Sequence, residues 1–278
     1  MRIDSHQHYW LASRTDYGWL RPELGRIYAD YMPAQLKPHL ARHGIDRTIL
    51  VQAAPTWEES EFMLGIAAAD ETVAGVVGWL DLTADDFLAK WDERRRRYPK
   101  LVGLRPMIQD LPSDWLLAPT VVRHLAALAD AGFPVDLQAN PRHLPYIVEL
   151  LRQVPHLRAV VDHLAKPAMT GDREPWQSHM EEVAAYPNVM AKLSGMVPEQ
   201  LDAPWSADVI APYARAVIET FGRGRVMFGS DWPVCLFSAT YDEVIALLES
   251  CTPDGWSDDE KAALYGGNAA AFYKLDVG

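Results

Sequence analysis

The 278-residue sequence is poor in cysteine, in positive charge and in long apolar runs, and each shortage excludes a class of protein. It has only two cysteines, Cys235 and Cys251, too few for a disulfide-stabilised scaffold. With 26 Lys and Arg against 38 Asp and Glu, the formal net charge is -12, which argues against nucleic acid as a partner. No apolar run reaches the roughly 18 residues of a membrane-spanning helix, so no membrane partner is expected. Without a signal peptide, the expected location is cytoplasmic.

Short apolar segments alternate with longer segments of helical periodicity along the whole chain. The apolar segments lack strict alternation with polar residues, which is typical of buried parallel strands. A barrel of eight strand and helix units takes about 250 residues, so the sequence predicts one α/β domain over residues 1–278, a (β/α)8 TIM barrel. The predicted strands are Arg2–His6, Arg47–Ala53, Val73–Leu80, Lys100–Pro106, Phe133–Ala139, Arg158–Leu164, Asn188–Ser194 and Val226–Ser230.

The segments between the strands predict helices and one long connection. Residues Tyr9–Arg26 have no clear period and are predicted to form a loop over the barrel mouth. Ser257, with Glu260 three residues later, predicts a capping box at the start of the terminal helices. The predicted helices are Glu58–Ala69, Asp85–Arg97, Val121–Ala131, Arg142–Gln153, Trp176–Tyr186, Asp208–Phe221, Thr240–Ser250 and, with a break at Gly266 and Gly267, Ser257–Tyr273.

His6 and His8 lie two residues apart near the end of the first strand. The pleat of a strand puts both imidazoles on one face, which would be the inside of the barrel. Such a pair can bind a divalent cation together, or donate hydrogen bonds to one oxygen of a substrate. A His-X-His spacing is also common by chance, so its meaning depends on the other strand ends.

Polar residues end almost every predicted strand. In barrels of this kind the C-terminal strand ends and the loops after them form the active site, so this recurrence predicts a catalytic mouth. The residues at these ends are His6 and His8, Gln52, Trp79, Arg105, Asp136 or Gln138, Asp162 with His163, Lys192 with Ser194, and Asp231 with Trp232.

Asp231 is the predicted general base, because its carboxylate would point to the axis near the paired imidazoles and could take a proton from water. The alternative is a turn aspartate before Pro233. His163 is predicted to be a third catalytic imidazole, with a hydrogen-bonded core histidine as the alternative. Arg105 could polarise a substrate oxygen or form a structural salt bridge. Lys166 and Lys192 are weaker candidates, since each could be a solvated or structural lysine.

Ten tryptophans are a high count, and several fall in or beside the predicted mouth loops. Aromatic faces suit the C–H face of a sugar ring while amides and hydroxyls bind its edge. Tryptophans on the outer helices, such as Trp91 and Trp176, are more simply core residues. The mouth tryptophans are Trp10, Trp57, Trp79, Trp115 and Trp232, and the predicted substrate contacts are Arg105, Gln52, Trp79, Trp10, Trp232 and Lys166.

Five segments together resemble the amidohydrolase superfamily, in the branch that contains sugar lactonases such as L-fucono-1,5-lactonase and L-rhamnono-lactonase. The similarity runs from Arg2 to Tyr273, nearly the whole chain. It implies a (β/α)8 barrel and hydrolysis of a lactone ring. The segments are IDSHQHYW near the N-terminus, VVDHLAKP and AKLSG in the middle, VMFGSDWPVC later, and GGNAAAFY near the C-terminus.

The resemblance places His6, His8, His163 and Asp231 on the first, sixth and eighth strand positions of the family. Metal-rich superfamily members carry a bridging Lys or Glu at the end of strand four and a His at the end of strand five. Here strand four ends at Leu104, Arg105 and Pro106, and strand five offers Asp136, Gln138 and Asn140, so a binuclear centre is not expected. The four residues could hold one divalent cation, with Zn expected if a metal is present. Related lactonases can work without a required metal, so the alternative is a metal-independent site.

The expected function is hydrolysis of a small-molecule sugar lactone, resembling L-fucono-1,5-lactone, in sugar catabolism. Asp231 would activate water while His6, His8 and His163 polarise the carbonyl or hold the metal. The alternatives are a lactonase for an aromatic-acid-derived lactone (pyrone dicarboxylate or muconolactone), a related metal-dependent decarboxylase, and a noncatalytic sugar-binding barrel. An aromatic dicarboxylate would need several cationic contacts, and beyond Arg105, Lys166 and Lys192 few are evident.

Overall fold

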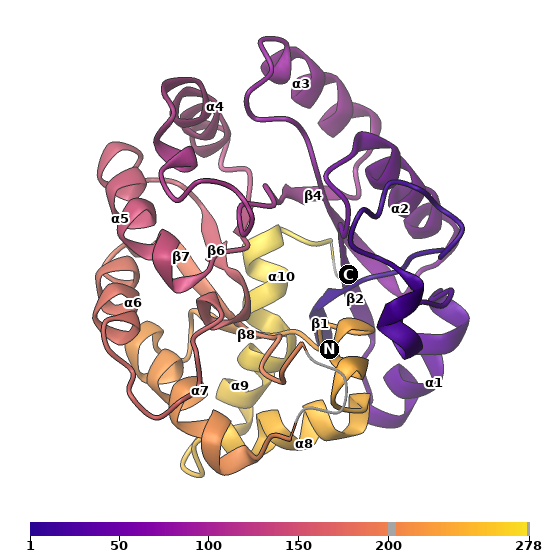
Figure 1. The fold of residues 1–278 in the computed structure, drawn as a ribbon, viewed down its shortest axis with the longest axis vertical. Coiled ribbons are helices and arrows are strands. Elements are labelled where there is room, and N and C mark those ends of the chain that lie inside the picture. Colours follow the sequence, from indigo (N-terminus) through magenta and orange to yellow (C-terminus); the bar gives the residue numbers. More distant parts are fainter. Residues whose placement is uncertain (200–203, 277–278) are drawn as a thin grey trace.

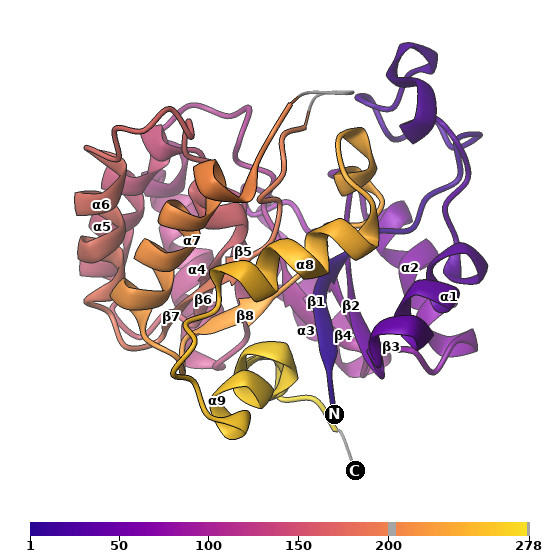
Figure 2. The same cartoon turned by 90° about the horizontal axis from the view of Figure 1, so that it is seen from below.

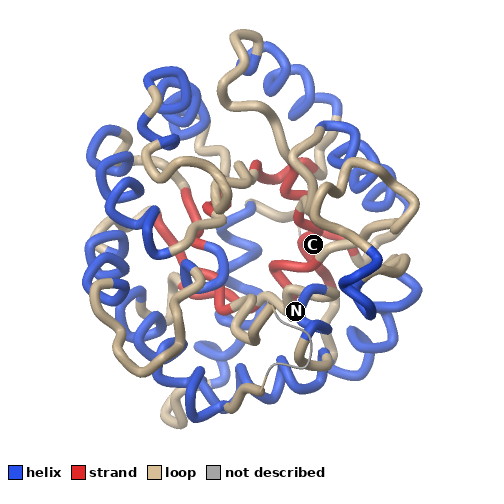
Figure 3. The backbone as a smooth tube through the Cα atoms, viewed as in Figure 1, coloured by secondary structure: helices blue, strands red, loops and turns tan. Residues whose placement is uncertain are grey.

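The chain forms a barrel of eight parallel strands inside a ring of helices (Figures 1 and 3). The computed structural model describes residues 1–199 and 204–276. From β1 to β8 each strand pairs in parallel with the next along the chain, as predicted for a (β/α)8 barrel. The strands are β1 (Ile3–Gln7), β2 (Arg47–Val51), β3 (Val73–Gly78), β4 (Leu101–Leu104), β5 (Val135–Leu137), β6 (Ala159–Val161), β7 (Val189–Leu193) and β8 (Val226–Phe228).

A helix follows each strand, and all predicted helices are present with ends shifted by a few residues. Helix α1 was not predicted from the sequence, because Pro38 interrupts its helical periodicity. Its other proline, Pro33, occupies the first turn, a position that tolerates proline. The helices are α1 (Pro33–His43), α2 (Trp57–Ala69), α3 (Phe87–Arg97), α4 (Pro119–Asp130), α5 (Leu144–Gln153), α6 (Trp176–Ala184), α7 (Ala207–Phe221), α8 (Tyr241–Cys251), α9 (Asp258–Ala262) and α10 (Asn268–Tyr273).

The C-terminal helices close the end of the barrel where the chain begins. The capping box predicted at Ser257 is present: the Ser257 hydroxyl accepts from the Glu260 amide, and the Glu260 carboxylate accepts from the Ser257 amide. Phe272 and Tyr273 of α10 pack against apolar side chains from the strands, among them Ile3. Figure 1 shows α10 in the centre of the ring, and Figure 2 shows the N-terminus and α9 at this same end. This end of the barrel is therefore filled by apolar packing.

The opposite end carries the long first connection. Trp10, Tyr17 and Leu20 of this connection pack with Ala53 after β2 and Phe237 after β8. In Figure 2 the connection rises above the strands at the end opposite to α9. The predicted loop over the mouth is confirmed, and it also contains a short 3₁₀ helix, Pro22–Ile27. None of the helices in the described ranges is both long and apolar enough to cross a membrane.

Backbone hydrogen bonds between β1 and the segment after β8 close the barrel. The Asp231 amide donates to the His6 carbonyl at 2.8 Å, and the His8 amide donates to the Trp232 carbonyl at 2.7 Å. Gly229 permits this approach, since a Cβ there would lie 2.5 Å from the His6 Cβ. The closure places Asp231 beside the two histidines.

The buried Asp4 carboxylate adds hydrogen bonds to this seam, the junction between β1 and the segment after β8. It accepts hydrogen bonds from the amides of His6 (3.2 Å) and Ser230 (2.8 Å) and from the Tyr241 hydroxyl (3.1 Å). Burial raises the pKa of Asp4 to about 6, against the lowering effect of these hydrogen bonds. One side chain thus ties together β1 and the segment after β8, which carry His6, His8 and Asp231.

Candidate active site

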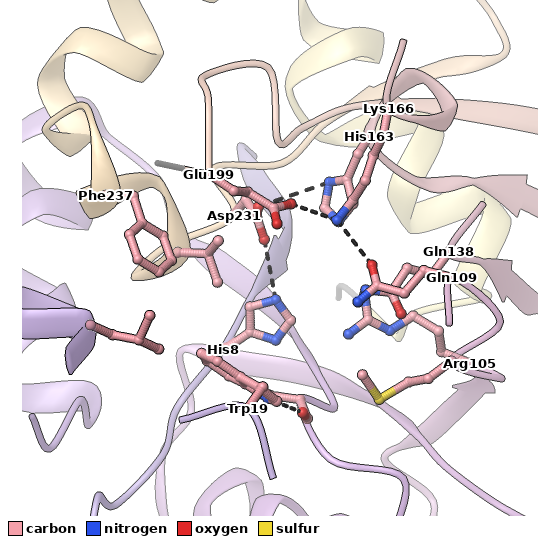
Figure 4. A pocket seen from close by; sticks show the side chains of 14 residues that line it. His8, Trp19, Arg105, Gln109, Gln138, His163, Lys166, Glu199, Asp231 and Phe237 are labelled. Atoms are coloured by element: carbon pink, nitrogen blue, oxygen red, sulfur yellow. Dashed lines mark hydrogen bonds and ion pairs between the residues drawn. The ribbon is translucent and has the colours of Figure 1, made fainter. Parts of the chain in front are cut away.

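A cavity of about 240 Å³ opens at the C-terminal ends of the strands (Figure 4). This is below the roughly 300–1,000 Å³ of pockets for drug-sized ligands, so it suits a small molecule. One part of its wall is apolar and the other is polar and charged. The apolar lining residues are Trp19, Leu24, Ala53, Met107, Val234 and Phe237, and the polar ones are His8, Arg105, Gln109, Gln138, His163, Lys166, Glu199 and Asp231.

His8 and Asp231 face each other at the cavity floor, with 3.2 Å between His8 Nε2 and Asp231 Oδ1 (Figure 4). The other ring nitrogen, Nδ1, lies 2.7 Å from the Val51 carbonyl oxygen, which can only accept, so Nδ1 carries a hydrogen. In neutral His8, Nε2 then has a lone pair directed at a carboxylate oxygen. Two lone pairs repel each other, so a proton or another cation between His8 Nε2 and Asp231 Oδ1 would make this contact favourable.

His163 reaches the cavity because of an unusual backbone conformation. The chain leaves β6 and takes left-handed φ angles at four consecutive residues, from 55° at His163 to 49° at Lys166. Each costs a non-glycine residue roughly 1–2 kcal/mol. Asp231, with φ 57°, is also left-handed. Gly195 makes room for the imidazole, since a Cβ there would lie 2.5 Å from His163 Nδ1. Backbone strain therefore collects at the residues predicted to be catalytic.

His163 Nδ1 has two neighbours that hold the ring in place. The Ser194 hydroxyl lies 2.9 Å away, and Asp231 Oδ2 lies 4.0 Å away. The ring centroid of His163 lies 4.5 Å from that of His6, edge to face. The three imidazoles and Asp231 that the sequence predicted are thus brought together.

His6 is fully buried and lies below the lining residues rather than among them. Its Nε2 lies 3.7 Å from Asp231 Oδ1 and 3.4 Å from Arg105 Nη1. Its Nδ1 lies 3.5 Å from Asp162 Oδ1 and 3.2 Å from Lys192 Nζ. His6 is therefore placed to support the lining residues or to bind a metal ion, and not to touch a substrate in the cavity.

Arg105 lines the cavity although its side chain is only 2% exposed. One end of its guanidinium donates to Asp162 Oδ2 at 3.3 Å, and the other donates to the Gln52 carbonyl. In turn, the Gln52 amide donates to the Arg105 carbonyl at 2.9 Å. Within the described residues, Arg105 Nε and Gln138 Oε1 are buried without a hydrogen-bond partner. Both belong to side chains that line the cavity, so a polar ligand there could satisfy them.

Burial and charge set the protonation of the floor residues. Burial alone would raise the pKa of the Asp231 carboxyl, but the adjacent His163 and the His8 hydrogen bond outweigh it and hold that pKa below its usual value. Burial lowers the pKa of His163 and, further, that of His6, with nearby carboxylates opposing the change. At neutral pH, Asp231 is therefore ionised, while His6 and His163 are neutral.

Two groups of buried ligand atoms could hold a metal ion in the described part of the chain. His6, His163 and Asp231 each offer one atom, and these atoms lie within 4.8 Å of one another. The same holds for His6, Asp136 and Asp162. The first group borders the cavity, whereas the second lies deeper in the barrel.

Several predicted substrate contacts lie away from the cavity, and these predictions are corrected. Trp10 is fully buried, donates to the Ala29 carbonyl and packs edge to face on Trp19. Trp232 is buried against two tyrosines behind the seam. Trp79 lines a separate hollow together with residues of α2 and α3. Gln52 is fully buried beneath Arg105. Of the predicted substrate contacts, Arg105 and Lys166 do line the cavity.

Four residues that line the cavity above its floor were not predicted from the sequence: Trp19, Phe237, Gln109 and Glu199. Trp19 and Phe237 supply the aromatic side chains there, and Gln109 and Glu199 hold the Lys166 ammonium at 3.0 and 2.5 Å. The position of Trp19 inside the long first connection was the available signal. Gln109 and Glu199 lie in loops and Phe237 ends the short 3₁₀ helix Val234–Phe237, and no motif marks these three residues.

The rim beside Trp19 depends on the buried Glu59. Its carboxylate accepts hydrogen bonds from the Ala53 and Ala54 amides, and the Ala53 carbonyl accepts one from the Trp19 indole at 2.7 Å. Burial raises the pKa of Glu59 from 4.5 to about 7, although these amide bonds oppose the change. The protonated acid is thus favoured in the folded state more than in the unfolded chain.

We therefore expect Glu59 to make stability depend on pH. The stabilisation of the folded state by protonated Glu59 is fully present below pH 4.5 and is lost as the pH rises through about 7. The loss amounts to about 3 kcal/mol. Glu59→Gln keeps an acceptor oxygen but cannot ionise, so its free energy of unfolding should fall less than that of the wild type between pH 5 and 8. Urea unfolding across this range tests the prediction, and parallel curves for the two proteins would contradict it.

In a comparison with known protein families, residues 3–275 match the family model described as Amidohydrolase. The chain belongs to the amidohydrolase family. It is 41% identical over 281 residues to L-fucono-1,5-lactonase of Burkholderia ambifaria, covering 99% of this chain and 96% of that protein. L-Fucono-1,5-lactonase of Burkholderia multivorans is 37% identical, with the same two coverages. The crystal structure of a Burkholderia multivorans amidohydrolase with bound zinc superposes with a TM-score of 0.91, at 34% identity over 99% of both chains.

The resemblance stated from the sequence is thereby confirmed at the level of the family. In this amidohydrolase the segment after β4 places Arg105 at the cavity, as the sequence suggested. The Asp136 carboxylate of β5 instead points into the barrel, where it pairs with Lys192 of β7 at 2.5 Å.

Proposed function

We propose that this chain is a lactonase that hydrolyses a sugar-derived aldonolactone, of the L-fucono-1,5-lactone type, to the aldonic acid. The observation that carries the proposal is the Asp231 carboxylate beside His8 and His163 at the floor of a small cavity. The apolar wall can cover the C–H face of a sugar ring, and the amides and charged groups opposite can bind its hydroxyls. Two relatives named L-fucono-1,5-lactonase support this substrate class.

Asp231 is the general base in this mechanism. It takes a proton from a water molecule, whose oxygen forms a bond to the lactone carbonyl carbon. His8 Nε2 lies 3.2 Å from Asp231 Oδ1 and is placed to share this proton. The bond between the carbonyl carbon and the ring oxygen breaks next. The proton passes to the ring oxygen, so the products are a free hydroxyl and a carboxylic acid.

Arg105 and His163 stabilise the negative charge that develops on the carbonyl oxygen. The Arg105 guanidinium is buried and fixed by Asp162 and Gln52, so it needs no reorganisation during the reaction. The Ser194 hydroxyl fixes the His163 ring, which either donates to the oxygen or serves as a metal ligand. His6 supports this arrangement from below the cavity.

The floor residues also fit one divalent cation. His6, His163 and Asp231 are buried, and they supply the nitrogen and carboxylate ligands that Zn²⁺ prefers. His8 can join them through Nε2, because its Nδ1 hydrogen is committed to the Val51 carbonyl. A bound metal would lower the pKa of a water molecule and polarise the carbonyl. The zinc bound in the similar Burkholderia multivorans amidohydrolase supports metal binding by this chain.

A pH-indicator screen of hexono- and pentono-lactones, run with and without chelator, tests the proposal. Acid release from a sugar lactone is expected, and loss of this activity in chelator would show that the metal is required. A pyrone dicarboxylate and a muconolactone belong in the panel, although Arg105 and Lys166 are already paired with Asp162 and Glu199. If ligands raise the Tm without acid release from any substrate, the chain is a sugar-binding barrel and the proposal fails.

The aromatic wall makes a further prediction about substrate affinity. Trp19→Leu removes an indole that lines the cavity and should raise KM about fivefold, with kcat changed much less, since an aromatic contact of this kind contributes about 1 kcal/mol. Trp79→Leu is the matched control, because Trp79 lies in a separate hollow and its loss should leave KM unchanged. Initial rates measure both, and equal KM values in the two variants would contradict the assignment.

A further inference from the structure

A second set of buried ligand atoms lies beneath the catalytic floor, and a lysine occupies it. Asp136 of β5, Asp162 after β6 and His6 of β1 offer atoms within 4.8 Å of one another. Lys192 Nζ, from β7, lies 2.5 Å from Asp136 Oδ2, 3.2 Å from Asp162 Oδ1 and 3.2 Å from His6 Nδ1. All four side chains are fully buried.

We propose that the Lys192 ammonium is a built-in cation that fills what would otherwise be a second metal site, and thereby positions His6 and Asp162. The sequence predicted that no binuclear centre forms, and this inference gives the physical reason. The part that concerns positioning rests on the proposed lactonase function, whereas the part that concerns metal binding does not.

The negative charges of Asp136 and Asp162 are balanced by positive charges only when Lys192 is present. Asp136 and Asp162 are two buried carboxylates, and within the described residues the cations beside them are Lys192 and Arg105, which bonds Asp162. The Tyr273 hydroxyl of α10 also donates to both Asp136 oxygens, at 2.8 Å. Without the lysine, two buried carboxylates would share one arginine, and an unpaired buried charge is strongly unfavourable.

The same contacts block a metal ion. A metal ion needs lone pairs of several ligands directed at one point, and the three ligand atoms instead face an ammonium, which has only hydrogens to offer. A divalent cation could enter only by displacing the side chain of a residue held on both sides by β6 and β8. In the group of His6, His163 and Asp231, the nitrogen of His6 that faces Asp231 is Nε2, whereas Lys192 contacts Nδ1, so the lysine does not occupy this group.

Lys192 also fixes two groups that act at the cavity. Asp162 holds Arg105, and His6 contacts both Arg105 and Asp231. Lys192 touches Asp162 and His6 from the opposite side, so it is a positioning residue that does not itself reach the substrate cavity. Its loss should therefore change the orientation of the floor as well as its charge.

The decisive variant is Lys192→Ala, which vacates the site and leaves its ligands. In chelator, its Tm should fall by about 10 °C, because an unpaired buried carboxylate remains. In calorimetric titration with Zn²⁺, it should bind one equivalent more than the wild type, and the added zinc should recover part of the lost Tm. Lys100→Ala is the matched control, since the Lys100 ammonium bonds the carbonyls of Ala67 and Val73 rather than carboxylates, and its zinc stoichiometry should equal that of the wild type.

The double variant Lys192→Ala with Asp136→Ala removes the cation together with one carboxylate. It should lose the additional zinc equivalent and regain part of the Tm. Unchanged zinc stoichiometry and unchanged Tm in Lys192→Ala would overturn the proposal, as would an additional equivalent that persists in the double variant.

The wild type provides a test that does not depend on how the variants fold. Anomalous diffraction at the zinc edge, from crystals soaked in Zn²⁺, should show no peak between Asp136 and Asp162. A peak there would overturn the proposal. These measurements use no lactone, so they remain valid whether or not the chain proves to be a lactonase. In an active enzyme, Lys192→Ala should also lower kcat more than it raises KM.

Discussion

In the Asp231→Asn variant, kcat for lactone hydrolysis falls by about 10³-fold, within the range that general-base catalysis contributes. The amide has the shape of the carboxylate but cannot take a proton from water. It also removes the group that shares a proton with His8 at 3.2 Å and that could bind a metal with His6 and His163. The defect should therefore appear in kcat with or without metal.

Asp231→Asn should keep its fold. The residue has a φ of 57°, in the left-handed region that asparagine adopts more readily than most residues. Its backbone bond to the His6 carbonyl is unaffected by the substitution. Steady-state kinetics and thermal unfolding measure the two effects, with Asp92→Asn on the exposed face of α3 as the control. Nearly normal kcat in a folded Asp231→Asn protein would remove Asp231 from its proposed role.

The second large effect is expected at Arg105. Arg105→Met should lower kcat/KM by about 10²–10³-fold, the usual cost of losing one donor to a developing oxyanion. It should also destabilise the protein by about 3–5 kcal/mol, because Asp162 loses its guanidinium partner inside the barrel. Kinetics with a sugar lactone and urea unfolding would measure the two losses separately.

Arg105→Lys separates the charge of Arg105 from its geometry. Lysine restores a cation beside Asp162, so most of the stability should return. Lysine has no planar fork that can bond both Asp162 and the Gln52 carbonyl, so kcat/KM should stay at least tenfold below that of the wild type. If Arg105→Lys restores full activity, the geometry of the guanidinium has no role in the reaction.

The local sequence pattern was sufficient to predict the barrel and to identify the four polar residues gathered at and beneath the floor of the cavity. Buried strands and amphipathic helices have their own periods, and the capping box at Ser257 needs only two side chains three residues apart. His6, His8, His163 and Asp231 could be found because each follows or ends a strand, and parallel strands of a barrel bring their C-terminal ends to one place. Helix α1 was missed because Pro38 masks its period.

The positions of the tryptophans could not be derived in this way. Trp79 directly follows β3, yet it lines a separate hollow, whereas Trp19, far from any strand end, lines the cavity. A strand fixes the direction of its own side chains, but whether a loop residue reaches the mouth depends on how the loops pack on one another. Trp19 does so because the first connection packs against residues after β2 and β8.

The sequence by itself determined the order of the eight strands, the end of the barrel that carries the chemistry, and the histidines and aspartate gathered there, because these follow from short-range periodicity and from the geometry of parallel strands. Only the tertiary structure decided that His6 lies below the cavity and that Lys192 sits between Asp136 and Asp162. These contacts join strands far apart in the chain, where charges pair according to distance in space and not in sequence.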